Sequence, residues 1–466
     1  MATLQEDSQG NEVKELQANL EKLGFYAGQL DSDFGPETKG AVQDFQARYG
    51  GLKVDGIVGS NTFNAIQAAL VSTPPTPFSF FSKFKKEEDK AKANADKLVF
   101  LDRGLDNPES PFKEEIINYP AHLQRKPDGV TLLSHLDKSG KFSPYPPHDE
   151  YPSSGIEENG LSFLSLDVQQ ACVCIGSFDA SSNLKARWVG RNALEPVQFW
   201  SATKFIPVLN LVCQANRREL SIPIEECTIR GSAETVGTPF AELVTDLVSY
   251  REGVDHSNVV AEMFKRFETT PHSNLETWLR RITHNDNLKF QGGYSSSEPF
   301  IKKPTLYHPA SDKSIVKFQD PGTGSNYLSA YDLVRMISML GWHNYLPSVG
   351  LPNAEWHSLA SVVKCMGTDT ARYVDVAIKT LGLQSTTGAP VIISKLGFGT
   401  TGRGEDALTY TAFVQFIDGN SSPAKLRTLA MALRIPTTAA AAPKHDAKMA
   451  SEVTEIIRRI VTEELA

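Results

Sequence analysis

Ser201-Ala-Thr-Lys204-Phe-Ile-Pro-Val-Leu-Asn-Leu-Val-Cys213 is the stretch that decides the fold of this chain. The apolar run after Lys204 predicts a buried helix. Residues three apart share one face of a helix, so Lys204 is expected beside Ser201. Burial lowers the pKa of an amine, and a neutral amine can take the proton that serine must lose to become a nucleophile. The stretch therefore predicts an activated serine, although S-x-x-K by itself occurs by chance in many chains of this length.

The segments around this helix predict an antiparallel sheet. Upstream, residues 171–178 and 184–189 form β-rich runs joined by a turn-rich segment, which is typical of a hairpin. Downstream, short turns join three further runs, so we expect three successive antiparallel strands over 388–397, 407–417 and 426–435. Apolar residues then recur at helical spacing, which predicts a closing helix over 448–465.

This order of elements resembles the serine β-lactamase and penicillin-binding D,D-peptidase superfamily, and class A β-lactamases in particular. The superfamily carries the motifs S-x-x-K, S-D-N and K-T-G around a helical middle. The resemblance covers residues 161–466. It implies an α/β (α+β) domain with a five-stranded antiparallel sheet and a helical lobe. It also implies a serine-type hydrolase that forms an acyl-enzyme on Ser201 with D-Ala-D-Ala stem peptides or β-lactams.

The second motif is altered. His256-Ser257-Asn258 occupies the S-D-N place, and Asn258 follows Ser201 by 258 − 201 = 57 residues. The resemblance implies that Asn258 holds the substrate amide. The family's first serine passes a proton to the leaving nitrogen, and here His256, Ser257 or neither of them would do so. A second copy, His272-Ser273-Asn274, is expected to cap the next helix, because Ser and Asn are favoured there.

The third motif is altered as well, since Lys395-Leu396-Gly397 stands where the family has K-T-G. The resemblance implies that Lys395 attracts a substrate carboxylate and that Gly397 lets substrate backbone lie against the strand. The missing threonine hydroxyl is worth about 1.5–3 kcal/mol as a hydrogen bond to a charged group. The backbone N–H groups of Ser201 and Phe398 would hold the oxyanion.

A deacylating base has one candidate. Class A enzymes use a Glu-Pro pair between the second and third motifs, and Glu298-Pro299 lies in that interval. Lys302 stands where the family has an asparagine. Glu298 either activates water or is a solvated loop acid. Without a working base the acyl-enzyme would persist, as it does in penicillin-binding proteins.

An internal repeat marks the first 70 residues. Residues 30–42 and 54–66 both follow the pattern apolar-Asp-x-x-apolar-Gly-x-x-Thr-x-x-Ala-apolar. The segment resembles the small, all-α, three-helix peptidoglycan-binding domain, which implies peptidoglycan as a partner. The candidate contacts with this ligand are Tyr26, Asp31, Phe34 and Gly35. The alternative is that these residues only hold the bundle together.

The predicted organisation is thus a peptidoglycan-binding domain over 1–70, a Pro-rich linker over 71–97, an unassigned segment over 98–160 and the serine-hydrolase domain over 161–466. The net charge of −8 argues against nucleic-acid binding. The five cysteines have no metal-ligand spacing, and Cys172 and Cys174 are expected to face one side of a strand as buried hydrophobes. We therefore expect neither a metal nor a cofactor.

The place of action stays open. The implied substrate belongs to the cell envelope or extracellular space, yet the first residues contain neither a basic nor an apolar run, so we expect no signal peptide and no transmembrane segment. Two main functions follow from the residues. One is a peptidoglycan-targeted serine hydrolase; the alternative, which the altered motifs favour, is a catalytically inactive β-lactamase-like binding or structural module. A wall-binding adaptor with an unrelated fold is a third interpretation, and the order of the motifs argues against it.

Overall fold

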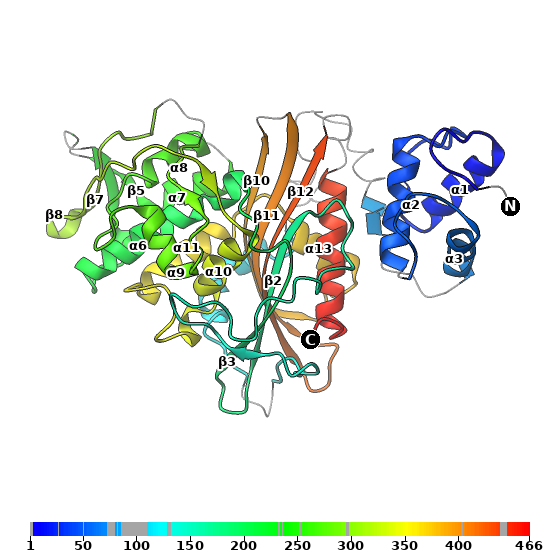
Figure 1. The fold of residues 1–466 in the computed structure, drawn as a ribbon. Coiled ribbons are helices and arrows are strands. Elements are labelled where there is room, and N and C mark those ends of the chain that lie inside the picture. Colours follow the sequence, from blue (N-terminus) through cyan, green and yellow to red (C-terminus); the bar gives the residue numbers. More distant parts are fainter. Residues whose placement is uncertain are drawn as a thin grey trace.

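The computed structural model describes residues 3–26, 28–49, 51–71, 80–81, 83–84, 110–127, 132–231, 234, 236–250, 253–294, 298–401, 404–438 and 445–466. The predicted fold class is confirmed. A small helical unit precedes a large α/β unit built on an antiparallel sheet (Figure 1). The predicted linker lies largely outside the described residues.

The small unit is a bundle of three helices with a hydrophobic cluster of its own: α1 (Asn11–Lys22), α2 (Pro36–Tyr49) and α3 (Ser60–Val71). The two copies of the repeat form its turns, and a buried glutamine closes each turn. Gln17 Nε2 donates to Asp31 Oδ1 at 2.7 Å and to Thr38 Oγ1 at 3.2 Å. Gln46 Nε2 repeats this geometry with Asp55 at 3.1 Å and Thr62 at 3.2 Å. The repeat therefore encodes a turn whose backbone and side-chain polar groups are satisfied internally.

The main sheet of the large unit has the order β1-β3-β2-β12-β11-β10, and every neighbouring pair is antiparallel. Its five long strands are those predicted from the sequence: β2 (Gln170–Phe178), β3 (Leu184–Arg191), β10 (Thr387–Thr400), β11 (Glu405–Asp418) and β12 (Lys425–Thr438). A sixth, short strand, β1 (Ser143–Pro144), comes from the unassigned segment and extends the β3 edge.

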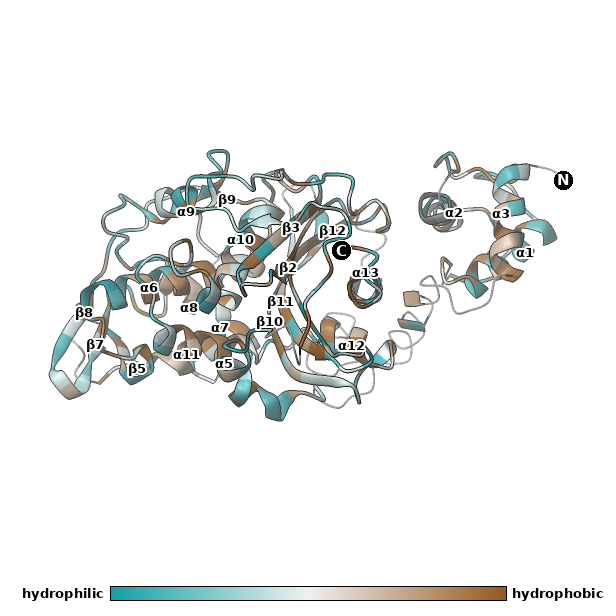
Figure 2. Cartoon of the chain, turned by 90° about the horizontal axis from the view of Figure 1, so that it is seen from below, coloured by the Kyte–Doolittle hydropathy of each residue, from teal (hydrophilic) through white to brown (hydrophobic). Residues whose placement is uncertain are grey.

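Both faces of the sheet are covered, because successive strand residues point to opposite sides. Cys172 and Cys174 belong to the core shared with the helical lobe, as expected, whereas Val173 between them belongs to the opposite core. That second core lies against α12 (Tyr373–Thr380) and the closing helix α13 (His445–Val461). The apolar residues of the strands accordingly lie between layers of helices (Figure 2).

The helical lobe contains more than helices, which corrects the predicted all-helical middle. Two small sheets, of order β5-β4-β7-β8 and β6-β9, lie among its helices. These strands are β4 (Thr228–Gly231), β5 (Thr238–Pro239), β6 (Lys289–Phe290), β7 (Pro304–His308), β8 (Lys313–Val316) and β9 (Asn326–Tyr327). The α-helices of the lobe are α6 (Phe205–Arg218), α7 (Phe240–Ser249), α8 (Ser257–Phe264), α9 (Leu275–Thr283), α10 (Ala330–Gly341) and α11 (Trp356–Met366).

The described part of the unassigned segment packs on the large unit. Besides β1 it forms a 3-10 helix, η1 (Lys113–Asn118), and the short helix α5 (Tyr119–His122). Tyr145 then enters the core beneath α10, where its hydroxyl lies 2.6 Å from Ser338 Oγ. The segment therefore completes the sheet edge and the core.

The bundle lies beyond α13, on the side of the sheet away from the helical lobe (Figure 1). Lys448 on α13 forms an ion pair of 3.0 Å with Asp44 on α2, and Ser165 Oγ donates to the same carboxylate at 3.2 Å. In the described part of the chain we find no helix with the length and apolar character needed to span a bilayer.

We expect Gln17→Ala to destabilise the bundle, because the substitution leaves the backbone N–H of Ser32 and the Thr38 hydroxyl without their glutamine partner. The expected cost is about 1–3 kcal/mol. Hydrogen exchange of the full chain, followed over peptides from 11–49, measures it. Glu15→Ala, an exposed change on the same helix, is the control and should stay within about 0.5 kcal/mol of the parent. Equal protection in both variants would contradict a structural role for the glutamine.

Candidate active site

Ser201 lies in a 3-10 helix, η2 (Trp200–Thr203), and α6 begins only at Phe205, with Lys204 as its N-cap. The sequence predicted one α-helix through both residues, so this is a correction. Side chains three residues apart eclipse each other in a 3-10 turn, which still places Ser201 and Lys204 on one side. Trp200, just before the serine, has a φ of 50°. A bulky residue in this left-handed region is strained, and such strain is concentrated at functional sites.

The serine turn is pressed against β10. A Cβ on Gly397 would lie 2.5 Å from the Phe199 carbonyl oxygen and 2.6 Å from the Ala202 nitrogen. A Cβ on Gly399 would lie 2.5 Å from the Trp200 ring. Thr409 on β11 adds a hydrogen bond of 2.8 Å to the Phe199 carbonyl. Gly397 therefore serves close packing of the turn on the strand in this structure; the contact with substrate backbone stays a prediction.

Lys204 is fully buried. Its Nζ donates to Ser257 Oγ at 2.9 Å and to Asn258 Oδ1 at 2.6 Å. Burial lowers the pKa of Lys204 well below its ordinary value, and the charge of Lys395 lowers it further. A neutral amine has two N–H groups and one lone pair, so these two donated bonds leave the lone pair available for a proton. The environment therefore suits a general base.

The second motif surrounds this amine. Ser257 and Asn258 open α8, and Ser257 Oγ also donates to the Leu247 carbonyl at 2.8 Å. His256 is exposed and caps the helix, its Nδ1 accepting from the Asn258 N–H at 3.2 Å. Of the two shuttle candidates, Ser257 is thus the one hydrogen-bonded to the lysine. The predicted cap role of the second copy is confirmed, since Asn274 Oδ1 accepts from the Thr277 N–H.

Lys395 lies behind the site and has no exposed surface. Its Nζ donates to the carbonyls of Leu396 at 3.1 Å and Val248 at 3.4 Å. Desolvation lowers the pKa of Lys395 to about 8, and the nearby Asp369 carboxylate opposes this shift. The Tyr250 ring centroid lies 3.8 Å from the same Nζ. Lys395 does not line the cavity, so its predicted contact with a substrate carboxylate has no counterpart in this geometry.

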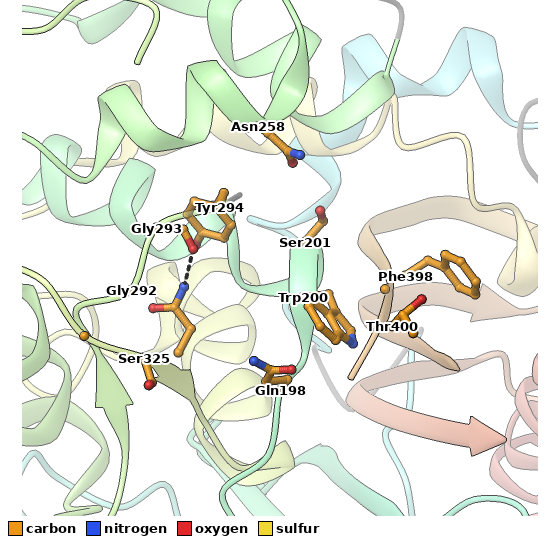
Figure 3. A pocket seen from close by; sticks show the side chains of 13 residues that line it. Gln198, Trp200, Ser201, Asn258, Gly292, Gly293, Tyr294, Ser325, Phe398 and Thr400 are labelled. Carbon is orange, nitrogen blue, oxygen red and sulfur yellow. Dashed lines mark hydrogen bonds between the residues drawn. The ribbon is translucent and has the colours of Figure 1, made fainter. Parts of the chain in front are cut away.

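A cavity of about 410 Å³ opens in front of Ser201 (Figure 3). Its lining consists of amides, hydroxyls, aromatic rings and glycines: Gln198, Trp200, Ser201, Asn258, Gly292, Gly293, Tyr294, Gly324, Ser325, Asn326, Phe398, Gly399 and Thr400. A third buried lysine, Lys265, supports the wall opposite β10. Lys265 Nζ donates to the Gly292 carbonyl and, at 2.9 Å, to Asn326 Oδ1. Desolvation lowers the pKa of Lys265 to about 7.

Glu298 is not among the residues that line the cavity. Its carboxylate is 63% exposed and lies 3.0 Å from Lys302 Nζ. The observed position is that of a solvated loop acid, the second of the two alternatives considered above.

The four candidate peptidoglycan contacts differ in exposure. Tyr26 and Phe34 are buried in the bundle, and the Tyr26 hydroxyl donates to the Gln29 carbonyl at 2.7 Å. Asp31 accepts from Gln17, as described above, but remains at the surface, and Gly35 is half-buried. Tyr26 and Phe34 therefore hold the turn together, which leaves Asp31 and Gly35 as the accessible pair.

Sequence reasoning missed several residues that shape the site. Tyr250 ends α7 with a φ of 56°, and its phenol donates to the Leu396 carbonyl at 2.9 Å. Burial raises the pKa of Tyr250, and a side-chain hydrogen bond with Ser201 opposes that rise. Tyr294, whose hydroxyl lies 3.0 Å from Thr203 Oγ1, faces Lys204 from the other side. Neither tyrosine stands in a motif, so only the fold brings them to the serine.

Comparison with known proteins finds a family match in the N-terminal part of the chain. Residues 9–66 match the family described as "Putative peptidoglycan binding domain". An N-acetylmuramoyl-L-alanine amidase, CwlM, of Mycobacterium tuberculosis is 25% identical over 209 residues, which are 41% of this chain and 50% of that protein. The zinc D-Ala-D-Ala carboxypeptidase of Streptomyces albus G is 45% identical over 80 residues, 17% of this chain and 31% of that protein. The chain thus spans half or less of the length of these relatives.

Among solved structures, a representative class A β-lactamase from Bacteroides cellulosilyticus is similar with a TM-score of 0.40 and 11% identity. The match covers 64% of this chain and 94% of that one.

We expect Gly397→Ala to displace the serine turn, because the new Cβ would overlap backbone atoms of residues 199 and 202. Overpacking of this kind costs about 1–3 kcal/mol. Thermal unfolding should show the loss, and labelling of Ser201 by a fluorophosphonate should fall with it. Gly388→Ala, in the same strand, meets ordinary contacts at 3.5 Å or more and serves as the control. Full labelling of Gly397→Ala would contradict the packing role.

The stability of the protein should rise with pH above 8 because of Lys395. The unfolded chain keeps the proton of this lysine up to a pKa of about 10.4, whereas the folded protein releases it near 8. Between these values the unfolded state binds more protons, so the free energy of unfolding increases, on the order of 3 kcal/mol in all. Denaturant titrations from pH 7.5 to 10.5 test this. Lys204 and Lys265, whose pKa values are also lowered by burial, contribute to the same rise. Lys395→Met should therefore make the rise smaller, and an identical slope in both proteins would contradict the role of Lys395.

Proposed function

We propose that this chain is a peptidoglycan-targeted serine hydrolase of the β-lactamase and penicillin-binding type. The observation that carries the proposal is the buried Lys204 amine, which shares a side with Ser201 and has its two N–H groups engaged by Ser257 and Asn258. Serine needs such a base, and the cavity in front of it can admit an acyl donor. Stem peptides ending in D-Ala-D-Ala, or β-lactams, are the implied substrates.

The proposed steps use residues of this chain alone. Lys204 takes the Oγ proton of Ser201, and the oxygen attacks the substrate carbonyl. The backbone N–H groups of Ser201 and Phe398 hold the resulting oxyanion, each worth about 2.7–4 kcal/mol. The proton then returns to the leaving nitrogen, with Ser257 as the carrier beside Lys204. The C–N bond breaks, and an ester on Ser201 remains for water to hydrolyse.

Deacylation is proposed to be the slow step. The cavity residues that the structure describes include no carboxylate that could activate water, and Glu298 stands at the surface beside Lys302. The acyl-enzyme would then persist, as in a penicillin-binding protein, rather than turn over as in a β-lactamase.

The bundle is proposed to hold the enzyme on its substrate. Its match to a peptidoglycan-binding family and the amidase and carboxypeptidase names of the relatives support this role. The proposed division follows the sequence: a binding domain over 1–70, a linker over 71–97, a supporting segment over 98–160 and a hydrolase domain over 161–466. Attachment raises the local concentration of wall bonds near Ser201.

The alternative function is a catalytically inactive module that binds cell-wall material. The burial of Lys395, which leaves the expected carboxylate recogniser outside the cavity, favours this alternative. Both functions share the bundle and differ in whether Ser201 reacts.

A fluorescent fluorophosphonate, which requires only an activated serine, should label the parent chain and not Ser201→Ala. Lys204→Met should lose labelling by a factor of about 100 or more, because general-base assistance is worth that much. Labelling is measured by gel fluorescence after fixed times. Ser273→Ala, an exposed serine outside the site, is the control and should label fully. Absence of label on the parent chain supports the inactive module.

Fluorescent penicillin and nitrocefin then separate a β-lactamase from a slow-releasing peptidase, since a stable penicillin adduct without nitrocefin turnover is expected. Binding to the wall is tested separately by co-sedimentation with purified sacculi. The full chain should sediment, whereas a chain that lacks residues 1–71 should stay in solution at the same concentration. Equal sedimentation of both proteins would refute the anchoring role.

A further inference from the structure

The described lining of the cavity carries no formal charge, because none of its residues is Asp, Glu, Lys or Arg. Gln198, Asn326 and Thr400 offer neutral hydrogen-bonding groups, and Trp200 offers an apolar ring. A carboxylate that entered this space would lose hydration, and the described lining residues offer it no cation in return. Burial of an unpaired charge is costly, whereas amide and hydroxyl groups of a neutral ligand would be satisfied.

Lys395 is the lysine of the third motif, and it is not among the residues that line this cavity. Its Nζ donates to two backbone carbonyls, at 3.1 and 3.4 Å. The Asp369 carboxylate, which accepts from Ser394 Oγ at 2.6 Å, lies in the same buried region and stabilises the ammonium there. The charge of Lys395 is therefore stabilised by groups inside the protein and does not face the cavity.

Tyr250 separates Lys395 from the serine. Its ring lies over the ammonium, with 3.8 Å from Nζ to the ring centroid, and its phenol reaches Ser201 and the Leu396 carbonyl. The residue adopts a φ of 56°, which is unusual for a bulky side chain, so surrounding contacts hold it in this place. The ring thus lies against the ammonium that also donates to the two carbonyls.

We propose, on the basis of the acyl-transfer function above, that the site prefers acyl donors without a terminal carboxylate on the leaving side to the carboxylate-bearing D-Ala-D-Ala peptides and β-lactams. The chemical class is a neutral amide- or ester-linked chain, such as an internal peptide bond of a cross-linked stem. Tyr250 is the specificity-determining residue, because it withholds Lys395 from the substrate.

The test compares two peptides, an N-acyl-L-Lys-D-Ala-D-Ala with a free carboxylate and the same peptide as its C-terminal carboxamide. Mass spectrometry of released D-alanine or D-alaninamide gives kcat/KM for each. The parent chain should cleave the carboxamide at least as well as the acid. Tyr250→Gly removes the strain of the left-handed backbone at this position and uncovers Lys395. The ratio of kcat/KM for the acid to kcat/KM for the carboxamide should therefore rise by about tenfold or more.

Two matched variants isolate the cause. Tyr250→Phe keeps the ring and loses the phenol, so the absolute rate can change while the ratio stays at the parent value. Tyr250→Gly combined with Lys395→Met should abolish the shift, because the uncovered cation is gone. A shift that survives in the double variant would overturn the role of Lys395.

The inference is overturned if the parent chain prefers the acid tenfold or more, or if Tyr250→Gly cleaves both peptides with an unchanged ratio. Labelling of Ser201 by fluorophosphonate without cleavage of either peptide would overturn the peptide class and leave the acyl-transfer function standing. Failure of both labelling and cleavage would remove the proposed function itself.

Discussion

The close approach of the serine turn to β10 is the constraint on which the rest of the site depends. Two glycines of the strand face the turn, and a methyl group at either would overlap atoms of residues 199–202. This contact holds Ser201 beside the strand, and Phe398 of the same strand lines the cavity with it. The left-handed backbone of Trp200 is strained, and the packing of the turn against the sheet offsets the cost of this strain.

Behind the turn, three lysines are buried, and each is used differently. Lys204 gives its hydrogen bonds to side chains of α8, Lys265 to the opposite wall and Lys395 to backbone carbonyls. Burial disfavours the charged form of each lysine. The partners of each lysine oppose this effect to a different extent. The charge of Lys395 lowers the pKa of Lys204 further, whereas the Asp369 carboxylate raises the pKa of Lys395. The same residue type therefore has surroundings that suit a base in one place and a structural cation in another.

In the N-terminal bundle, the repeated residues stabilise the fold, and the repeat does not by itself identify the residues that bind a ligand. Gln17 and Gln46 occupy equivalent places and bond equivalent Asp and Thr residues, so the repeated Asp and Thr are explained by internal hydrogen bonds. A ligand would meet the residues that this network leaves at the surface. The ion pair between Asp44 and Lys448 ties the bundle to the closing helix of the large unit.

The sequence by itself determined the elements and the motif residues, because hydrophobic periodicity and turn chemistry are local. It thereby predicted the five long strands, the closing helix, the bundle and the association of Ser201 with a buried lysine. The tertiary structure alone decided that Lys395 lies inside, that Tyr250 and Tyr294 flank Lys204, and that Glu298 stays at the surface. These outcomes depend on how distant segments pack, and a side chain's environment in a folded core is set by neighbours that no local pattern specifies.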